Sequence, residues 1–314
     1  MISKKIIKSI YKKLFLIRES ETFISKIYHT DKIKSPVHLS IGQESLAVGI
    51  CENLMKNDLV SNSYRSHATY LAKGGGLKTF FSELYGKETG CAGGRGGSMH
   101  LVNIKNGIIG ASAVVGTTIP IAAGYALKEK IKRSKNIVVC FFGDGATEEG
   151  CFYETLNFSA LHSLPIIFVC ENNGLAINTN LKKRWSKDNL IEKVKTFGIN
   201  AKKITSDDVI KIYLETKKVI KKVRTSKKPY FVEIKCLREF EHVGPKNDMN
   251  ESYRDKAYSR KFSKNLFKNT IFKKLKLKEK KIIEREINNE IKKAVNFAEK
   301  SKFPSKKTVL NNVY

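Results

Sequence analysis

IVVCFFGDGATEEGCFYETLNFSALHSLPIIFVCENNGLAINT, residues 137–179, is the stretch that decides the fold. It contains two short apolar runs, residues 137–142 and 165–170, which predict strands buried on both faces of a parallel sheet. Between the two runs, residues 148–161 place apolar side chains at helical spacing. The order strand, helix, strand predicts an α/β fold with a mainly parallel sheet. Alternating residues at 230–236 predict a further strand of the same sheet.

Polar residues follow both predicted strands. Asp144 comes directly after the first, and Asn173 ends the polar triplet that follows the second. Because parallel strands joined by a helix end at the same edge of the sheet, we expect the two side chains to border one crevice. A carboxylate and an amide suit a hard divalent cation such as Mg²⁺, which completes its coordination with water and phosphate oxygens. The pair therefore predicts a metal site that accompanies a diphosphate.

Glycines flank Asp144. Gly143 and Gly145 are expected to allow unusual backbone dihedrals, and the amides of Gly145 and Ala146 are expected to face phosphate at the start of a helix. Taken singly, Asp144 is equally well explained as a helix cap and Asn173 as a turn residue. The strand, turn, helix and strand between them favour the ligand site.

The GDG at 143–145 and the NN at 172–173 resemble the thiamine diphosphate signature of the transketolase-like enzymes. In these enzymes the aspartate and the second asparagine hold magnesium. The resemblance therefore implies Asp144 and Asn173 as metal ligands, with Leu175 as a further one. It also implies a three-layer fold in which helices cover both faces of the sheet.

Two other motifs narrow the resemblance. The segments HLSIGQE, residues 38–44, and GCAGGRGGSMHL, residues 90–101, resemble the alpha subunits of the 2-oxo acid dehydrogenase first components, from the pyruvate, branched-chain and acetoin complexes. The resemblance implies that His38 is an active-site histidine. Tyr64 and Arg65 match the pair that binds the diphosphate, and a forked guanidinium suits phosphate oxygens.

The same resemblance implies contacts at the other end of the cofactor. Met99 and His100 would lie near the cofactor or the substrate, and the backbone of Ala113 and Val115 would contact the aminopyrimidine. The match is weaker at Asn103. From the residues alone, the glycine-rich loop could equally be a flexible linker.

Residues 237–254 predict a polar loop, which is too long for a simple connection. Arg238 and His242 match a catalytic-loop motif of the family, so His242 joins His38 as a candidate for proton handling. The following VGPKND replaces the usual serine-containing segment, which leaves the substrate open. Pyruvate is the preferred substrate, and an acetoin dehydrogenase-like or other carboligating enzyme is the alternative. His67 receives no definite role.

The formal net charge of +29 could indicate a nucleic acid, a membrane surface or an acidic partner. Residues 40–180 carry 12 basic and 11 acidic residues, so the excess lies in the flanks, without aromatic interleaving. A solvated lysine-rich surface is favoured, an acidic partner comes second, and a nucleic-acid-binding protein is a remote alternative. A nicotinamide-binding site is disfavoured because GDGATEEG lacks the GxGxxG spacing.

The composition, with 41% hydrophobic residues over 314 positions, predicts a single thiamine diphosphate-binding domain spanning residues 1–314. It would have an amino-terminal helix over about 3–28 and a carboxy-terminal helical extension over about 255–300. Lysines interrupt the apolar residues near the amino terminus, and the six cysteines show no paired spacing. A cytoplasmic location without membrane contact is therefore expected.

The resemblance also implies cofactors and partners. Thiamine diphosphate and Mg²⁺ would support decarboxylation of a 2-oxo acid, and the acyl group would pass to a lipoyl group on a separate acyltransferase. A beta subunit would supply the glutamate that activates the cofactor ring, in an assembly of two alpha and two beta chains.

Overall fold

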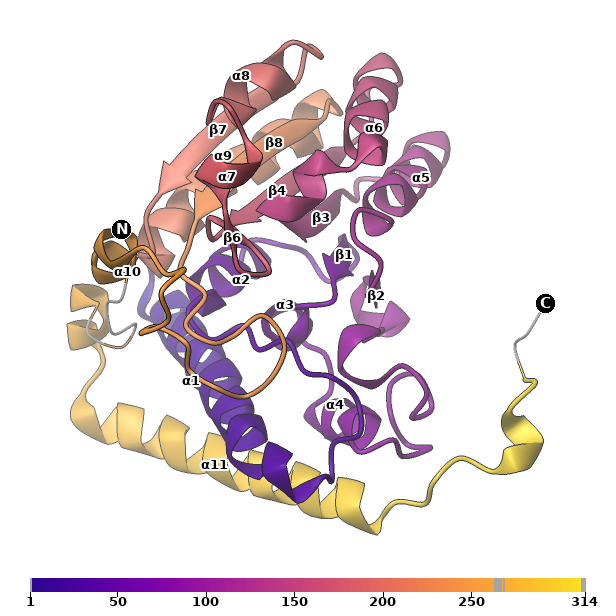
Figure 1. Cartoon of the computed structure of the whole chain (residues 1–314), viewed down its shortest axis with the longest axis vertical. Helices are drawn as coiled ribbons and strands as arrows, with labels where there is room; N and C mark the ends of the chain where they lie inside the picture. The colour runs from indigo at the N-terminus through magenta and orange to yellow at the C-terminus, as the bar shows by residue number, and fades with distance from the viewer. Residues whose placement is uncertain (1, 263–266, 268, 312–314) are drawn as a thin grey trace.

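The computed structural model describes residues 2–262, 267 and 269–311, and its centre is a six-stranded sheet (Figure 1). The strand order is β2-β1-β3-β4-β8-β7, and every neighbouring pair is parallel. A separate antiparallel hairpin follows β4. The strands are β1 (Leu59–Ser63), β2 (Ile108–Ser112), β3 (Val138–Gly143), β4 (Ile166–Asn172), β5 (Leu175–Ala176), β6 (Thr179–Asn180), β7 (Asn200–Thr205) and β8 (Tyr230–Lys235).

Helices cover both faces of the sheet because alternate residues of the central strands point to opposite sides. On β3, Val138, Cys140 and Phe142 enter a core with α5 (Thr118–Ile131), α6 (Gly150–Leu161) and α8 (Leu190–Lys195). Val139 and Phe141 enter the other core, which contains the remaining long helices. This arrangement confirms the predicted helix, sheet and helix layers.

The second layer includes helices from both ends of the chain. In Figure 1, α11 runs along the lower border and packs against α1 and α4. Among the described residues, no helix has the length and apolar character needed to cross a membrane. The helices not yet named are α1 (Lys4–Ile27), α2 (Glu44–Cys51), α3 (His67–Ala72), α4 (Leu77–Leu84), α7 (Leu181–Arg184), α9 (Val209–Ser226), α10 (Lys256–Phe262) and α11 (Leu277–Lys300).

The predicted terminal helices compare closely with these bounds. The amino-terminal prediction, 3–28, corresponds to α1. The carboxy-terminal prediction, 255–300, contains α10 and α11, while its residues 263–266 and 268 lie outside the described part of the chain. The organisation of the chain as one domain stays a prediction.

The predictions were wrong in two local respects after β3. A 3₁₀ turn, η4 (Asp144–Glu148), precedes an extended Glu149, so α6 begins only at Gly150. Gly143 has an ordinary φ of −76°, and Gly145 is not among the glycines with positive φ. No protein atom requires glycine at position 143 either, because an added Cβ would meet no atom within 4 Å.

Besides the short strands β5 and β6, three strands of the six-stranded sheet were not predicted from the sequence. In β1 the polar residues Ser61 and Asn62 are buried, so the strand lacks an apolar run. The other two, β2 and β7, form the edges of the sheet, and most of their residues are partly or fully exposed. Edge strands need no continuous apolar pattern, which is why periodicity did not reveal them.

Candidate active site

The carboxyl ends of the central strands carry the predicted site residues to one edge of the sheet. Tyr64 and Arg65 follow β1, Asp144 follows β3, and Asn173 follows β4. Tyr64, Arg65 and Asn173 border a cavity of about 270 Å³, whose walls also include Gly143, Gly145 and Ala146. Asp144 lies between two of these glycines in the sequence but is buried and does not itself line the cavity. This edge is where ligands bind in open parallel sheets.

Asp144 is the buried acid of this edge, with 1% of its surface exposed. Its Oδ2 accepts a hydrogen bond from Arg184 of α7, which also pairs with Glu148. Its Oδ1 is buried and has no hydrogen-bond partner among the described residues. Burial raises the pKa of Asp144, and the charge of Arg184 opposes that rise. An unsatisfied buried carboxylate oxygen fits a cation ligand, because leaving it unpaired is costly.

Asn173 shapes the turn between β4 and β5. Its Oδ1 accepts a hydrogen bond from the Leu175 amide at 3.0 Å, and its Nδ2 donates to Gln43 Oε1 at 3.2 Å. An amide oxygen has a second lone pair, so the turn leaves Asn173 able to coordinate a cation. Leu175 and Gln43 also border the cavity.

His38 and His242 lie far apart in the sequence, but the structure brings their rings to 5.2 Å between centroids. The Tyr64 ring lies 4.5 Å from His38 and 5.6 Å from His242. Burial, followed by the charge of Arg65, lowers the pKa of His38 to about 3 and that of His242 to about 4. Both imidazoles are therefore neutral near pH 7, where they can accept a proton or donate a hydrogen bond.

Arg65 connects the segments that carry these rings. It donates hydrogen bonds to the carbonyl oxygens of Leu39 at 2.6 Å and His242 at 3.1 Å, while its side chain still borders the cavity. Glu171, which is 5% exposed, faces the same cavity, and burial raises its pKa to about 7 against the influence of Arg65. Glu171 directly precedes the asparagine pair in the sequence, and this position could have identified it as a further candidate site residue.

The glycine-rich loop at residues 90–101 is ordered by a residue that the sequence analysis missed. Glu83, at the end of α4, is fully buried, and its carboxylate accepts four backbone hydrogen bonds. The donors are Ala92 at 2.7 Å, Gly94 at 3.0 Å, Gly96 at 2.7 Å and Gly97 at 3.1 Å. Gly90 must lack a side chain, because an added Cβ would lie 2.3 Å from the Glu83 carboxylate. The loop is therefore held rather than free.

His67 also contacts the glycine-rich loop, through Ser98. It is fully buried, its Nδ1 lies 3.1 Å from Glu21 of α1, and its Nε2 lies 2.8 Å from the Ser98 hydroxyl. The residue with no definite predicted role is thus a link between α1, α3 and the loop.

The residues expected near the aminopyrimidine are not among the cavity walls, with one exception. Val115 lines the cavity, whereas Met99, His100, Asn103 and Ala113 do not. His100 is exposed, with its Nδ1 3.2 Å from the carbonyl oxygen of Ala111 at the end of β2. The structure therefore brings the residues predicted for the diphosphate together more completely than those predicted for the aminopyrimidine.

Residues 237–254 form the predicted long loop, which is ordered around a buried acid. Asp248 pairs with Arg254 and accepts a hydrogen bond from Tyr253, and its carboxylate lies 3.5 Å from Arg238. The Gly244 amide donates to the Val37 carbonyl at 2.9 Å, so the loop pairs with the segment that carries His38.

The chain is similar to known dehydrogenase components over nearly all of its length. A family model for the dehydrogenase E1 component matches residues 12–307. The alpha subunit of an acetoin:2,6-dichlorophenolindophenol oxidoreductase from Bacillus subtilis (strain 168) is 32% identical over 311 residues, covering 97% of this chain and 92% of the relative. The alpha subunit of the pyruvate dehydrogenase E1 component from Rickettsia prowazekii (strain Madrid E) is 33% identical over 322 residues, covering 100% and 97%.

A solved transketolase from Campylobacter jejuni shares the fold, with a TM-score of 0.58 at 18% identity. The match covers 99% of this chain and 51% of the transketolase, so this chain spans about half the length of that protein. The sequence motifs, the parallel sheet and the family match agree. The chain belongs to the dehydrogenase E1 component family and is an alpha subunit of the thiamine diphosphate-dependent 2-oxo acid dehydrogenases.

Proposed function

We propose that this chain holds thiamine diphosphate through Mg²⁺ at the cavity beside β3 and β4. The observation that carries the proposal is the buried Oδ1 of Asp144, which has no partner in the described part of the chain and lies on the same sheet edge as Asn173. Asp144, the side chain of Asn173 and the carbonyl of Leu175 would hold the metal. Oxygen donors of this kind are the ones that Mg²⁺ prefers.

The diphosphate would lie against residues on two sides of the cavity. Tyr64 and Arg65 offer a hydroxyl and a guanidinium, and Gly145 and Ala146 offer backbone amides from the 3₁₀ turn. The open space at Gly143 supports close approach of a ligand to the backbone.

The ring end would use the remaining predicted contacts. Ala113 and Val115 would face the aminopyrimidine through their backbone, and Met99 and His100 would lie near the cofactor or substrate. When bound, thiamine diphosphate supplies an electron sink for decarboxylation of a 2-oxo acid. His38 and His242, both neutral, would orient the substrate or lipoyl group by hydrogen bonds and accept a proton.

Pyruvate is the proposed 2-oxo acid, and the acyl group would pass to a lipoyl group on an acyltransferase. An acetoin dehydrogenase-like activity is the second candidate, because relatives of both kinds have nearly equal identity to this chain. The VGPKND segment at 243–248 stands in place of the serine-containing segment that the family resemblance implies, which supports keeping both candidates.

A beta subunit is the proposed partner, in an assembly of two alpha and two beta chains. The support is an exposed set of apolar side chains on neighbouring helices and the loop before them. These residues are Val114 (63% exposed), Ile121 (52%), Phe158 (38%) and Leu161 (75%). A cytoplasmic location is proposed as well, since all six cysteines are free.

The test is turnover with and without the partner chain. At saturating thiamine diphosphate and Mg²⁺, the purified chain is expected to decarboxylate no 2-oxo acid, because ring activation needs a carboxylate from the beta subunit. Activity with pyruvate and an artificial electron acceptor should appear when the beta subunit is added. Robust turnover by the isolated chain would contradict the shared site, and a preference for acetoin would select the second candidate.

A further inference from the structure

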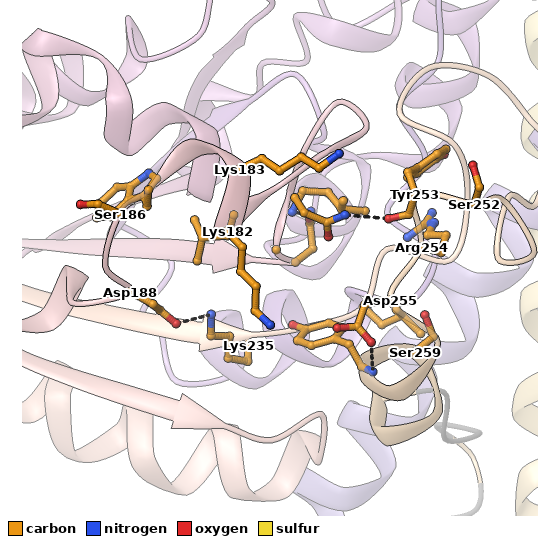
Figure 2. Close-up of a pocket in the computed structure, with 18 residues that line it drawn as sticks. Lys182, Lys183, Ser186, Asp188, Lys235, Ser252, Tyr253, Arg254, Asp255 and Ser259 are labelled. Carbon is orange, nitrogen blue, oxygen red and sulfur yellow. Dashed lines mark hydrogen bonds and ion pairs between the residues drawn. The ribbon is translucent and has the colours of Figure 1, made fainter.

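A second, larger cavity lies beside the candidate cofactor site. It encloses about 670 Å³ between the β5–β6 hairpin, α7 and the segment that leads into α10 (Figure 2). The two cavities share Asn173 and Leu175 as lining residues. Its volume falls within the range of sites that bind whole small molecules. None of its other lining residues lines the first cavity, although Tyr253 and Arg254 also contact Asp248 in the loop of residues 237–254.

The charges around this cavity are unbalanced. Four cationic side chains line it, against the carboxylates of Asp188 and Asp255. Lys235 lies 3.2 Å from Glu233 and 3.7 Å from Asp188, and Arg254 pairs with Asp248. By contrast, no carboxylate oxygen of the described residues lies within 4.0 Å of the Lys182 or Lys183 ammonium groups. Figure 2 shows Lys182 extending from the α7 side toward the segment that carries Asp255.

A buried donor adds a second, independent observation. Arg254 is 6% exposed, and its Nε is buried without a hydrogen-bond partner in the described part of the chain. A buried guanidinium nitrogen without an acceptor is costly unless a ligand or water completes it. Ser252 and Ser259 add hydroxyl groups to the same wall.

The other walls are aromatic. Trp185 and Tyr253 line the cavity, and aromatic rings of this kind suit the uncharged body of a small molecule. We propose that this cavity binds a phosphorylated metabolite, with its phosphate near Lys182, Lys183 and Arg254 and its body against the aromatic side chains. Ammonium and guanidinium donors together suit a phosphate dianion.

The chain offers a direct readout, because Trp185 is its only tryptophan. Glucose 6-phosphate is the probe, titrated into the full chain while the fluorescence of Trp185 is followed. The titration is repeated in saturating thiamine diphosphate and Mg²⁺ at constant ionic strength. We expect saturable binding that persists with the cofactor present. Loss of binding on adding the cofactor would place the probe in the first cavity and overturn the proposal.

The variant Lys182→Gln/Lys183→Gln removes two exposed cations without disturbing the buried network. It should weaken binding of the probe by at least about tenfold. The matched control is Lys187→Gln, an exposed lysine of the same segment that does not line the cavity, and it should leave binding unchanged. Equal weakening by both changes would indicate general charge attraction and overturn the proposal.

Citrate and inorganic phosphate complete the design. Citrate should bind at least about tenfold more weakly than the probe, and so should inorganic phosphate, which lacks the body that contacts the rings. Equal binding of citrate would overturn the phosphate assignment, as would absence of saturable binding by any of the three anions. Because thiamine diphosphate binding is measured separately, failure here is distinguishable from failure of the proposed function.

Discussion

The sheet edge and the two loops beside it hold their polar groups by different means. At the edge, Asp144 and Asn173 directly follow strands, so the sheet sets their backbone positions, and Arg184 and Gln43 contact only their side chains. Each loop instead depends on one buried acid, Glu83 for residues 90–101 and Asp248 for residues 237–254. We therefore expect the protein to stay folded when Asp144 or Asn173 is replaced. Replacement of Glu83 or Asp248 should instead disorder the loop that the acid holds.

The largest expected effect tests the edge. Asp144→Ala should abolish Mg²⁺-dependent binding of thiamine diphosphate, because a metal with few protein ligands tolerates no missing carboxylate. Isothermal titration calorimetry measures the affinity. Thermal unfolding should show a retained fold, since removal of a buried carboxylate also removes its desolvation cost. Asp31→Ala, at an exposed acid, is the control, and unchanged cofactor affinity in Asp144→Ala would end the metal assignment.

The loop side of the comparison is tested by Glu83→Gln. The backbone amides that donate to the Glu83 carboxylate would face an uncharged side-chain amide in the variant. Hydrogen bonds to a charged group contribute about 1.5–3 kcal/mol each. We expect the free energy of unfolding to fall by about 3 kcal/mol and amide hydrogen exchange to accelerate at residues 92–97. Glu88→Gln, an exposed acid nearby, is the control. Unaltered exchange in Glu83→Gln would show that the loop is ordered by other contacts.

The difference between residues placed by strands and loops held by a distant acid explains what could be predicted from the sequence. The apolar runs that became β3 and β4, and the polar residues after them, are local patterns that a parallel sheet brings together. Glu83 gave no signal, because its partners are backbone amides of a loop and its own helix looks ordinary. Arg184 was missed for a similar reason, since its contact with Asp144 spans a loop and needs the tertiary structure.

Buried polar strand residues set a further limit on prediction. Ser61 in β1 is 1% exposed, and its hydroxyl donates to the Thr118 carbonyl at 3.3 Å. A strand whose interior contains such residues cannot be recognised by apolar alternation. The family resemblance named His38 and His242 as candidates for proton handling, but their meeting was not predicted. It depends on how residues 237–254 return to the segment at 37–41.

A smaller effect, on pH dependence, tests the histidines that join the edge to the loop. The pKa values of His38 and His242 are lowered in the folded protein, to about 3 and about 4, so the unfolded chain binds more protons below about pH 6.5. Stability is therefore fully present above that pH and falls as the pH approaches 4. We expect His38→Asn to reduce the fall by about 2 kcal/mol, after allowance for solvent screening. Denaturant unfolding between pH 7 and pH 4 measures it, and identical pH profiles would contradict the neutral buried imidazole.

The smallest effect concerns Arg184 of the short helix α7, whose side chain reaches Asp144 at the sheet edge. Its guanidinium pairs with Asp144 and Glu148, so a metal that binds Asp144 must share this carboxylate with a neighbouring positive charge. Arg184→Gln should therefore strengthen Mg²⁺ binding severalfold, by about 1 kcal/mol, with thiamine diphosphate held at a fixed concentration. Lys187→Gln, an exposed cation of the same segment, should leave the affinity unchanged. If Arg184→Gln weakened Mg²⁺ binding instead, Arg184 would be a support for the bound diphosphate, and the edge would depend on a distant residue as much as the loops do.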